Sequence, residues 1–260
     1  DLLFYMHSEN DSLLLTGPGN QQKVMEWINK YTFTEDFTVE DVTDKYNILL
    51  LAGKNNEKLL KKLGVDTAKE EAFIDAEIRK IPVRLFKDMY GINFMTETNN
   101  YCPLNKTITA YGSEFELTDI DEPVFDSYRI YYVLPFFGKE IREEFNPMES
   151  GLMKYISFTK GCYPGQEVIA RLDSQDKVRN QIAGIIFEAD LPDDSVEEIE
   201  IFSDNQKIGK VTTIGYSLKM EKMTGICIIN KNSFDSEKEV RVKTKEIELK
   251  ARLTNLPFCL

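Results

Sequence analysis

The strongest constraint on the fold is the alternation of apolar and polar residues along the last third of the chain. The segments EIEIF, KIGKVTTIG, GICIIN and EVRVKTKEIELKARLT alternate in this way and are separated by polar breaks. A period of two places every second side chain on the same face of a β-strand. A succession of such short strands is typical of a β-sandwich or a β-barrel. We therefore predict that residues 178–260 form a separate all-β domain, with a hinge at 173–181.

The last of these segments changes the phase of its alternation. Val240 and Val242 share one face, whereas Ile247 and Leu249 fall on the other phase. A slip of one residue moves every following side chain to the opposite face. We predict a bulge or bend at this point, of the kind that small barrels use to turn corners.

The first 177 residues mix periods of two and of about 3.6, which predicts an α+β class for this part. The cluster TDIDEPVFD at 118–126 could suggest paired carboxylates, but we predict a solvated loop, because nothing apolar flanks the acids closely. The other predicted elements are a hairpin of 2–6 and 12–16, a helix capped by Asn20 with the apolar stripe Val24, Trp27, Ile28 and Tyr31, a buried strand at 47–53, a helix at 55–64 that buries Leu59, Leu60 and Leu63 and stops at Gly64, and a hairpin at 79–98.

The charge balance bears on the partners that this surface can take. The chain holds 32 Lys and Arg against 44 Asp and Glu, a net charge of -12. An acidic surface repels phosphate backbones, so we expect no direct nucleic-acid partner. No apolar run approaches the roughly 18 residues that a membrane span requires, and the start DLLFYMHSEND lacks the basic region of a secretory signal. We therefore expect no membrane partner.

Cysteine and histidine usage limits the possible chemistry. Four cysteines stand at 102, 162, 227 and 259 without a C-x-x-C spacing, which predicts neither a zinc knuckle nor a self-ligated cluster. Four cysteines in a chain this long do not make a disulfide scaffold, so a reducing compartment is the simpler interpretation. His7 is the only histidine, which removes most histidine-dependent triads and metal sites. We predict no resident metal site.

One cysteine lies in the segment KGCYPGQEVIARL, residues 160–172. Ile156 and Phe158 predict a preceding strand, residues 163–166 fit a type II turn, and the residues after it have helical spacing. A thiol at such an edge lies near a helix N-terminus and near Lys160, and such sites lower a cysteine pKa from about 8.5 to between about 3.5 and 7.5. The alternative is that Cys162 is a small buried hydrophobe. Without a histidine beside it, an ordinary cysteine-hydrolase mechanism is unsupported.

The segment KGCYPGQEVIAR resembles the K-G-C-[FY]-x-G-Q-E signature of the YgfZ-type folate-binding proteins, relatives of the glycine-cleavage T-protein. YRIYYVLPFFGKEI and NPMESGL are similar to the R-I-x-x-G-I-P-x-[FY]-G-x-[DE]-I and P-x-E-x-x-L segments of that family. GKVTTIGYS is similar to its G-x-V-T-S strand, and DLLFY resembles the end of a Gly-Arg-hydrophobic-x-Asp-Leu stretch. The resemblance covers most of the chain.

The resemblance implies an α+β, T-protein-like multi-domain fold, with ferredoxin-like units around a central cavity that binds tetrahydrofolate and a C-terminal antiparallel β-barrel. On this basis residues 1–43 belong to a ferredoxin-like unit of the folate-binding-like region, 44–177 form the folate-binding-like domain that carries the motif, and 178–260 form the barrel. It also implies that an N-terminal segment of the first domain precedes Asp1.

For function, the resemblance implies an accessory protein for synthesis or repair of iron–sulfur clusters in client enzymes, including radical enzymes that modify tRNA. Cys162 receives the reactive role and handles iron or sulfur species transiently. The implied partners are iron–sulfur client or assembly proteins and a folate-type small molecule, in the bacterial cytoplasm or the mitochondrial matrix. The frame of the motif comprises Lys160, Gly161, Tyr163, Gly165, Gln166 and Glu167.

The implied cofactor residues are Arg129, Tyr131, Asp1 and Arg171. Arg129 could equally be structural. Tyr131 stands where the T-protein branch carries a glutamate that holds the pterin ring, and a phenol cannot offer the paired acceptors of a carboxylate. Two alternatives to the accessory role remain open. One is a tetrahydrofolate-dependent aminomethyl or methyl transferase, and the other is a degenerate relative that acts only as a binding module.

Overall fold

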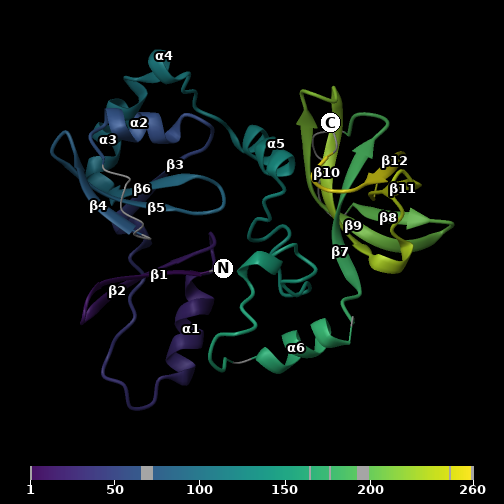
Figure 1. The fold of residues 1–260 in the computed structure, drawn as a ribbon, viewed down its shortest axis with the longest axis horizontal. Coiled ribbons are helices and arrows are strands. Elements are labelled where there is room, and N and C mark those ends of the chain that lie inside the picture. The colour runs from purple at the N-terminus through teal and green to yellow at the C-terminus, as the bar shows by residue number, and fades with distance from the viewer. Residues whose placement is uncertain are drawn as a thin grey trace. The chain divides into compact units, whose positions relative to one another are not determined.

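The structure is a computed structural model that describes residues 2–65, 73–163, 165–175, 177–191, 199–245 and 247–258, apart from the side chain of His7. The chain folds as two compact units, Asp1–Asp119 and Ile120–Leu260 (Figure 1). Among the described residues, no helix combines the length and the apolar character needed to span a membrane.

The first unit begins with the predicted hairpin and helix. Strands β1 (Leu2–Ser8) and β2 (Asp11–Thr16) pair antiparallel, and α1 (Gln21–Tyr31) follows. Asn20 is the N-cap residue, but its side chain makes no capping hydrogen bond. The apolar stripe of α1 contains no buried residue, and Trp27 and Tyr31 pack their rings on each other with centroids 4.6 Å apart. The helix is therefore confirmed, while its cap hydrogen bond is absent.

The rest of the first unit is an antiparallel sheet in the order β3-β6-β5-β4 (Figure 1). The predicted helix at 55–64 and hairpin at 79–98 are confirmed, and α2 buries Leu59 and Leu60 against the sheet. The prediction of a buried strand at 47–53 is wrong in part, because β3 is an edge strand whose Ile48 is exposed. The elements are η1 (Thr43–Lys45), β3 (Tyr46–Leu51), α2 (Asn56–Lys62), β4 (Phe73–Ile78), β5 (Ile81–Lys87), β6 (Ile92–Glu97), η2 (Thr98–Asn100), α3 (Tyr101–Thr109) and α4 (Gly112–Phe115).

A polar and aromatic cluster joins the hairpin to this sheet. The Tyr5 hydroxyl donates to Asp75 Oδ2 at 3.1 Å, and its ring lies 4.5 Å from that of Phe73. The Arg84 guanidinium stacks 4.0 Å over the Tyr5 ring and pairs with Asp75 at 2.7 Å. Burial, together with the hydrogen bond to Asp75, raises the pKa of Tyr5 above its ordinary value. Protonated Tyr5 is thus the form that this cluster stabilises.

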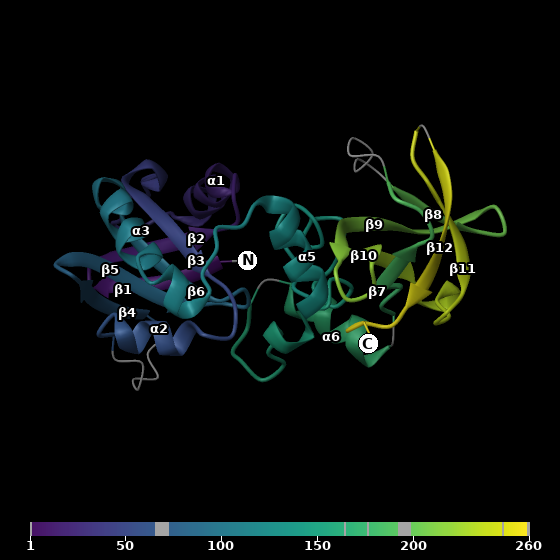
Figure 2. The same ribbon diagram turned by 90° about the horizontal axis from the view of Figure 1, so that it is seen from above.

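The second unit ends in a closed antiparallel barrel in the order β10-β7-β12-β11-β8-β9 (Figure 2). Its interior is apolar and includes Ile185, Ile201, Cys227 and Leu253. The predicted α+β class with a C-terminal antiparallel barrel is confirmed, whereas the three domain boundaries and the central cavity stay predictions. The elements are α5 (Glu122–Tyr132), η3 (Met153–Tyr155), α6 (Gln166–Ser174), β7 (Asn180–Phe187), β8 (Glu200–Ser203), β9 (Gln206–Ser217), β10 (Lys222–Asn230), η4 (Lys231–Ser233), β11 (Glu239–Lys243) and β12 (Glu248–Thr254).

The phase change near residue 244 is a hairpin, so the predicted bulge or bend within one strand is wrong. Lys243 pairs with Glu248 across the β11–β12 ladder, and the Thr244 amide donates to the Ile247 carbonyl at 2.9 Å. The chain turns back at this point and begins a new strand with its own phase. Register shifts occur instead at Ile226/Cys227 in the β9–β10 ladder and at Ile201/Phe202 in the β8–β9 ladder.

The acidic segment 118–126 is also corrected. Residues 118–121 are exposed and belong to no helix or strand, as predicted, but helix α5 begins at Glu122, where the Asp121 side chain accepts a hydrogen bond from the Val124 amide at 3.1 Å and caps the helix. Pro123 occupies the first turn, where a missing N–H costs nothing. Asp126 is buried inside the unit. An N-cap aspartate with proline two residues later was the signal for this helix start.

Candidate functional site

The Cys162 turn lies between η3 and α6. The prediction of a strand directly before this turn is wrong. Residues 156–163 pair with no strand of the described chain, and Phe158 is exposed. Alternation alone cannot supply the neighbouring strand on which an extended segment must pair. The Lys160 amide instead donates to Ser157 Oγ at 3.2 Å.

The turn itself has the backbone that was predicted where the structure describes it. Gly165 has φ 90° and ψ -5°, the left-handed conformation of the third residue of a type II turn. The Gln166 amide donates to the Tyr163 carbonyl at 3.2 Å and closes the turn. Pro164 lies outside the described residues. Helix α6 begins at Gln166, as predicted.

Cys162 is exposed, which favours an accessible thiol over a buried hydrophobe. Lys160 places its Nζ 4.2 Å from the Tyr163 ring centroid, so its charge lies over a side chain of the same turn. Gly161 and Glu167 are exposed, Tyr163 and Gln166 are half-buried, and Arg171 is exposed on α6. The role of each of these residues stays a prediction, and Asp1 lies outside the described residues.

The other described cysteines differ in their surroundings. Cys102 is exposed in the first turn of α3, whereas Cys227 is fully buried in β10, where its Sγ donates to the Ala183 carbonyl at 3.4 Å. Burial raises the pKa of the Cys227 thiol far above its ordinary value. Among the described residues, no group of three or more His, Cys, Asp or Glu side chains is placed to hold a metal ion.

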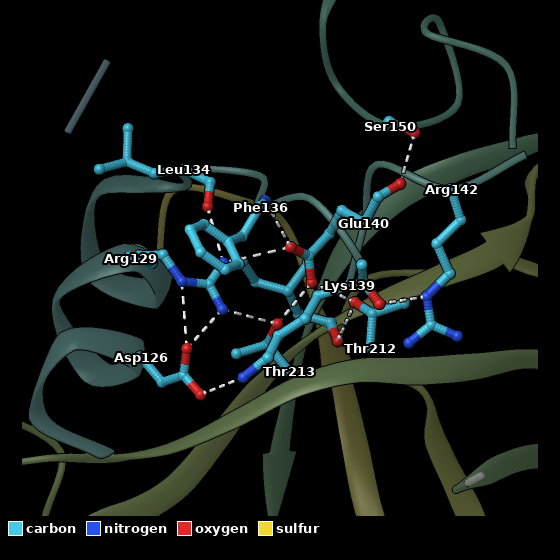
Figure 3. Close-up of polar contacts among 12 residues, drawn as sticks. Asp126, Arg129, Leu134, Phe136, Lys139, Glu140, Arg142, Ser150, Thr212 and Thr213 are labelled. Carbon is cyan, nitrogen blue, oxygen red and sulfur yellow. Dashed lines mark hydrogen bonds and ion pairs between the residues drawn. The ribbon is translucent and has the colours of Figure 1, made fainter. Parts of the chain in front are cut away.

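Arg129 is fully buried on α5, and its guanidinium donates all of its hydrogen bonds to groups of the protein (Figure 3). Nε and Nη2 donate to Asp126 Oδ1, Nη1 donates to the Leu134 carbonyl and to Glu140 Oε2, and Nη2 also donates to Thr213 Oγ1. A guanidinium has five N–H donors, and these contacts use all of them. The geometry therefore favours the structural role of Arg129, and its predicted ligand role has no donor left in this arrangement.

Glu140 is the second fully buried charge of this network (Figure 3). Its Oε1 accepts from the hydroxyls of Thr212 and Thr213, each at 2.5 Å, and its Oε2 accepts from the Phe136 amide at 3.0 Å. These contacts join α5, the turn that follows it and strand β9. Lys139 adds a contact to Asp126 at 2.5 Å. Glu140 was not among the predicted site residues, although it stands in the segment GKEI on which the family resemblance rests.

Tyr131 lies two residues beyond Arg129 on α5 and is not among the residues of this network (Figure 3). Its side chain is 49% exposed, and its ring meets that of Tyr132 edge-on with centroids 4.8 Å apart. A surface pocket of about 460 Å³ opens there. Its lining among the described residues contains no carboxylate and consists of Tyr131, Tyr132, Lys219, Pro257 and Phe258.

Glycine at position 215 sets the distance between α5 and the barrel. A Cβ placed on Gly215 would lie 2.8 Å from Ser127 Oγ and 2.9 Å from Ile130 Cδ1, both on α5. A side chain at position 215 would therefore require Ser127 and Ile130 to shift. The close contact and the Arg129 network hold the end of α5 that carries the two tyrosines of the pocket.

Comparison with known families identifies the class that this fold defines. The family model described as the GCVT N-terminal domain matches residues 1–160, and the model of the glycine cleavage T-protein C-terminal barrel domain matches residues 181–259. The chain therefore belongs to the glycine cleavage T-protein family, which confirms the predicted superfamily. Its assignment to the YgfZ branch stays a proposal.

Two curated relatives share about a quarter of their aligned residues with this chain. The aminomethyltransferase of Caldanaerobacter subterraneus is 25% identical over 99% of this chain and 70% of its own length. A putative chloroplastic transferase of Arabidopsis thaliana is 27% identical over 79% of this chain and 48% of its own length. The crystal structure of the glycine cleavage system aminomethyltransferase T from Bartonella henselae superposes with a TM-score of 0.75 at 17% identity, covering 99% of this chain and 71% of that one. This likeness supports the fold.

Proposed function

We propose that this protein is an accessory factor that assists the synthesis or repair of iron–sulfur clusters in client proteins through the thiol of Cys162. The observation that carries the proposal is the exposure of Cys162 in a turn closed by Gly165 and Gln166, inside the segment that resembles the YgfZ signature. An exposed thiol can meet a macromolecular donor or acceptor, which a buried one such as Cys227 cannot.

The chemistry proposed for Cys162 is ligand exchange with the cluster as cargo. The Cys162 thiol gives up its proton as its sulfur forms a bond to an iron atom, a thiolate of the donor leaves that iron and takes up this proton, and no oxidation state changes. The reverse exchange passes the iron to the client. A single thiol cannot supply the full set of thiolates that a resident cluster requires. Transfer, rather than storage, therefore suits the site.

Tetrahydrofolate is the ligand that the resemblance implies, and the residues at Tyr131 fit it poorly. A carboxylate offers two acceptor oxygens to a pterin edge, whereas a phenol offers a single hydroxyl. The pocket beside Tyr131 contains no carboxylate in its described lining, and Arg129 has no donor to contribute. The residues present therefore do not reproduce a glutamate-based pterin site, and no step through tetrahydrofolate is derived.

A folate-dependent aminomethyl transferase is the second candidate. It is favoured by the family and by the names of relatives such as the aminomethyltransferase of Caldanaerobacter subterraneus. Tyr131 in place of a pterin-binding glutamate weighs against it, and this chemistry has no role for an exposed cysteine. A direct assay for tetrahydrofolate-dependent aminomethyl transfer separates the two candidates, because the accessory role predicts no turnover.

The decisive experiment uses a strain that lacks the gene and reads out the activities of its iron–sulfur enzymes. Wild type is expected to restore these activities and Cys162→Ser is expected to fail, at equal protein level. Cys102→Ser is the matched control, since Cys102 is also exposed but lies outside the motif. Full restoration by Cys162→Ser overturns the proposal.

A further inference from the structure

We infer that the surface beside Cys162 is a docking site for an acidic segment of a partner protein that also carries apolar side chains. This surface, the Cys162 face, comprises Met153, Lys154, Tyr155, Phe158, Lys160 and Val168. Its residues belong to the second unit and lie on η3, on α6 or on the segment between them. The inference rests on the proposed function, because it names the chemistry of the protein that meets the Cys162 thiol.

Large apolar side chains are exposed on both sides of Cys162 in the chain. Met153, Tyr155 and Phe158 precede the cysteine and Val168 follows it, and each of the four is 45–54% exposed. Single apolar side chains are common on protein surfaces, but a group of them marks an interaction site. Aromatic and methionine side chains are enriched in protein–protein interfaces. The Cys162 face therefore offers apolar anchor positions for a partner.

Short turns shorten the stretch of chain that carries these side chains. The Ile156 amide donates to the Met153 carbonyl at 3.1 Å, and the Lys160 amide donates to Ser157 Oγ at 3.2 Å. A chain that turns in this way spans less than the roughly 3.3–3.6 Å per residue of an extended chain. The apolar side chains and the cysteine therefore lie on one contracted stretch.

Helix α6 contributes an apolar stripe that the protein leaves uncovered. Val168, Ile169 and Leu172 have helical spacing, yet none of the nine residues of α6 is buried. Helices shorter than about 12–15 residues are marginal in water, and packing of an apolar face usually stabilises them. A partner that covers this stripe would therefore also stabilise α6.

The charge of the same stretch favours an acidic partner. Residues 151–166 contain Lys154 and Lys160 and no Asp or Glu, whereas the whole chain has a net charge of -12. Lys154 Nζ lies 5.0 Å from the Tyr155 ring centroid, and Lys160 Nζ lies 4.2 Å from that of Tyr163. A cation over an aromatic ring places a positive charge beside an apolar surface. A segment with carboxylates between apolar side chains complements both features.

The same charges disfavour two other occupants. A second copy of the chain in a symmetric contact would bring the lysines of one face against those of the other. A nucleic acid would meet only two cations in residues 151–166, whereas binding to a phosphate backbone uses several such contacts, and the chain as a whole is acidic. A protein segment is therefore the favoured occupant.

The test measures binding of four unlabelled peptides of equal length to the full chain by isothermal titration calorimetry. Three of them share leucine and tryptophan positions and are acidic, neutral or basic elsewhere, and the fourth is acidic with serine at the apolar positions. We expect saturable binding of the acidic apolar peptide and binding of each of the others that is weaker by about fivefold or more. Added salt should weaken the acidic apolar peptide and leave the neutral one unchanged, because salt screens exposed charges.

Charge variants assign the binding to the Cys162 face. The double variant Lys154→Gln with Lys160→Gln should weaken the acidic apolar peptide about threefold to tenfold, through the loss of two exposed ion pairs. Lys243→Gln with Lys250→Gln is the matched control, because it removes the same charge from exposed positions of β11 and β12. The control should bind as wild type.

A second pair of variants tests the apolar anchors. Phe158→Ser should weaken the acidic apolar peptide about fivefold, because an aromatic anchor carries a large share of the binding at an interface. Leu218→Ser is the matched control, since Leu218 is also exposed but lies outside the Cys162 face. It should bind as wild type.

The inference is overturned if the acidic apolar peptide shows no saturable binding, if the neutral or basic peptide binds as tightly, or if either variant behaves like its control. Tighter binding of single-stranded oligouridylate would assign the face to nucleic acid, and dimers in sedimentation that Phe158→Ser dissociates would assign it to a second copy. Either result also overturns the inference. Peptide binding involves no thiol chemistry, so failure of the proposed function in the deletion strain and failure of this inference are distinguishable.

Discussion

Arg129 and Glu140 form a fully buried ion pair, with Nη1 of the arginine 3.2 Å from Oε2 of the glutamate. Removal of two charges from water costs several kcal/mol per ion, and such a pair persists only where further hydrogen bonds satisfy both groups. Here Thr212, Thr213 and the Phe136 amide donate hydrogen bonds to the glutamate. Asp126 and the Leu134 carbonyl accept the hydrogen bonds of the arginine. The pair therefore acts as one unit, and neither member can be removed alone without leaving an uncompensated charge.

Glu140→Ala is expected to lower the free energy of unfolding by about 3–5 kcal/mol, because Arg129 would remain buried without its second partner. Urea denaturation followed by circular dichroism measures this change. Glu114→Ala is the control, since it breaks an ion pair with Lys62 whose two side chains are 49% exposed, and it should cost less than about 1 kcal/mol. Equal losses in the two variants would contradict the structural role of the buried network.

Gly215→Ala should separate α5 from β9, because the added Cβ would lie 2.8 Å from Ser127 Oγ. Overpacking of this kind costs about 1–3 kcal/mol. Thermal denaturation provides the measurement. Gly161→Ala serves as the comparison, since no heavy atom lies within 4 Å of a Cβ placed there. If Gly215→Ala unfolds at the wild-type temperature, the close packing of helix on strand is wrong.

The cysteines should differ sharply in reactivity. In the native protein we expect iodoacetamide to modify Cys162 and Cys102, which are exposed, and to spare Cys227, whose thiol has its pKa raised by burial. Peptide mapping by mass spectrometry assigns each modification. In denaturant all three should react. Rapid labelling of native Cys227, or protection of native Cys162, would contradict the placement of these residues.

Alkaline pH should destabilise the first unit through Tyr5. Its folded-state pKa is raised above the ordinary value of 10.0, so the associated stability is present below pH 10.0 and is lost as pH rises through the folded pKa. Tyr5→Phe removes this titration. The difference in unfolding free energy between wild type and Tyr5→Phe should therefore stay constant from neutral pH to about pH 10.0 and shrink above it. A difference that is constant with pH would show that the Tyr5–Asp75 contact does not select the protonated phenol.

The predictions from sequence held where the signal was local. The strands of the barrel follow from alternation, and α2 follows from the spacing of its leucines and from Gly64 after its end. The same signals failed where the strand that pairs with a segment decided the structure of that segment. The change of phase near Thr244 is compatible with a bulge or a hairpin, and only the pairing of Lys243 with Glu248 distinguishes them. The segment before Cys162 alternates like a strand, but it has no neighbouring strand among the described residues.

The sequence by itself determined the class of fold, the family and the turn that carries Cys162, because period, glycine placement and motif spacing act over a few residues. Only the tertiary structure decided which polar residues are structural. Arg129 appears in sequence as a ligand candidate, but its partners Glu140 and Thr213 lie 11 and 84 residues further along the chain. The free energy of a buried charge depends on the groups that surround it in space, and sequence spacing does not report those groups.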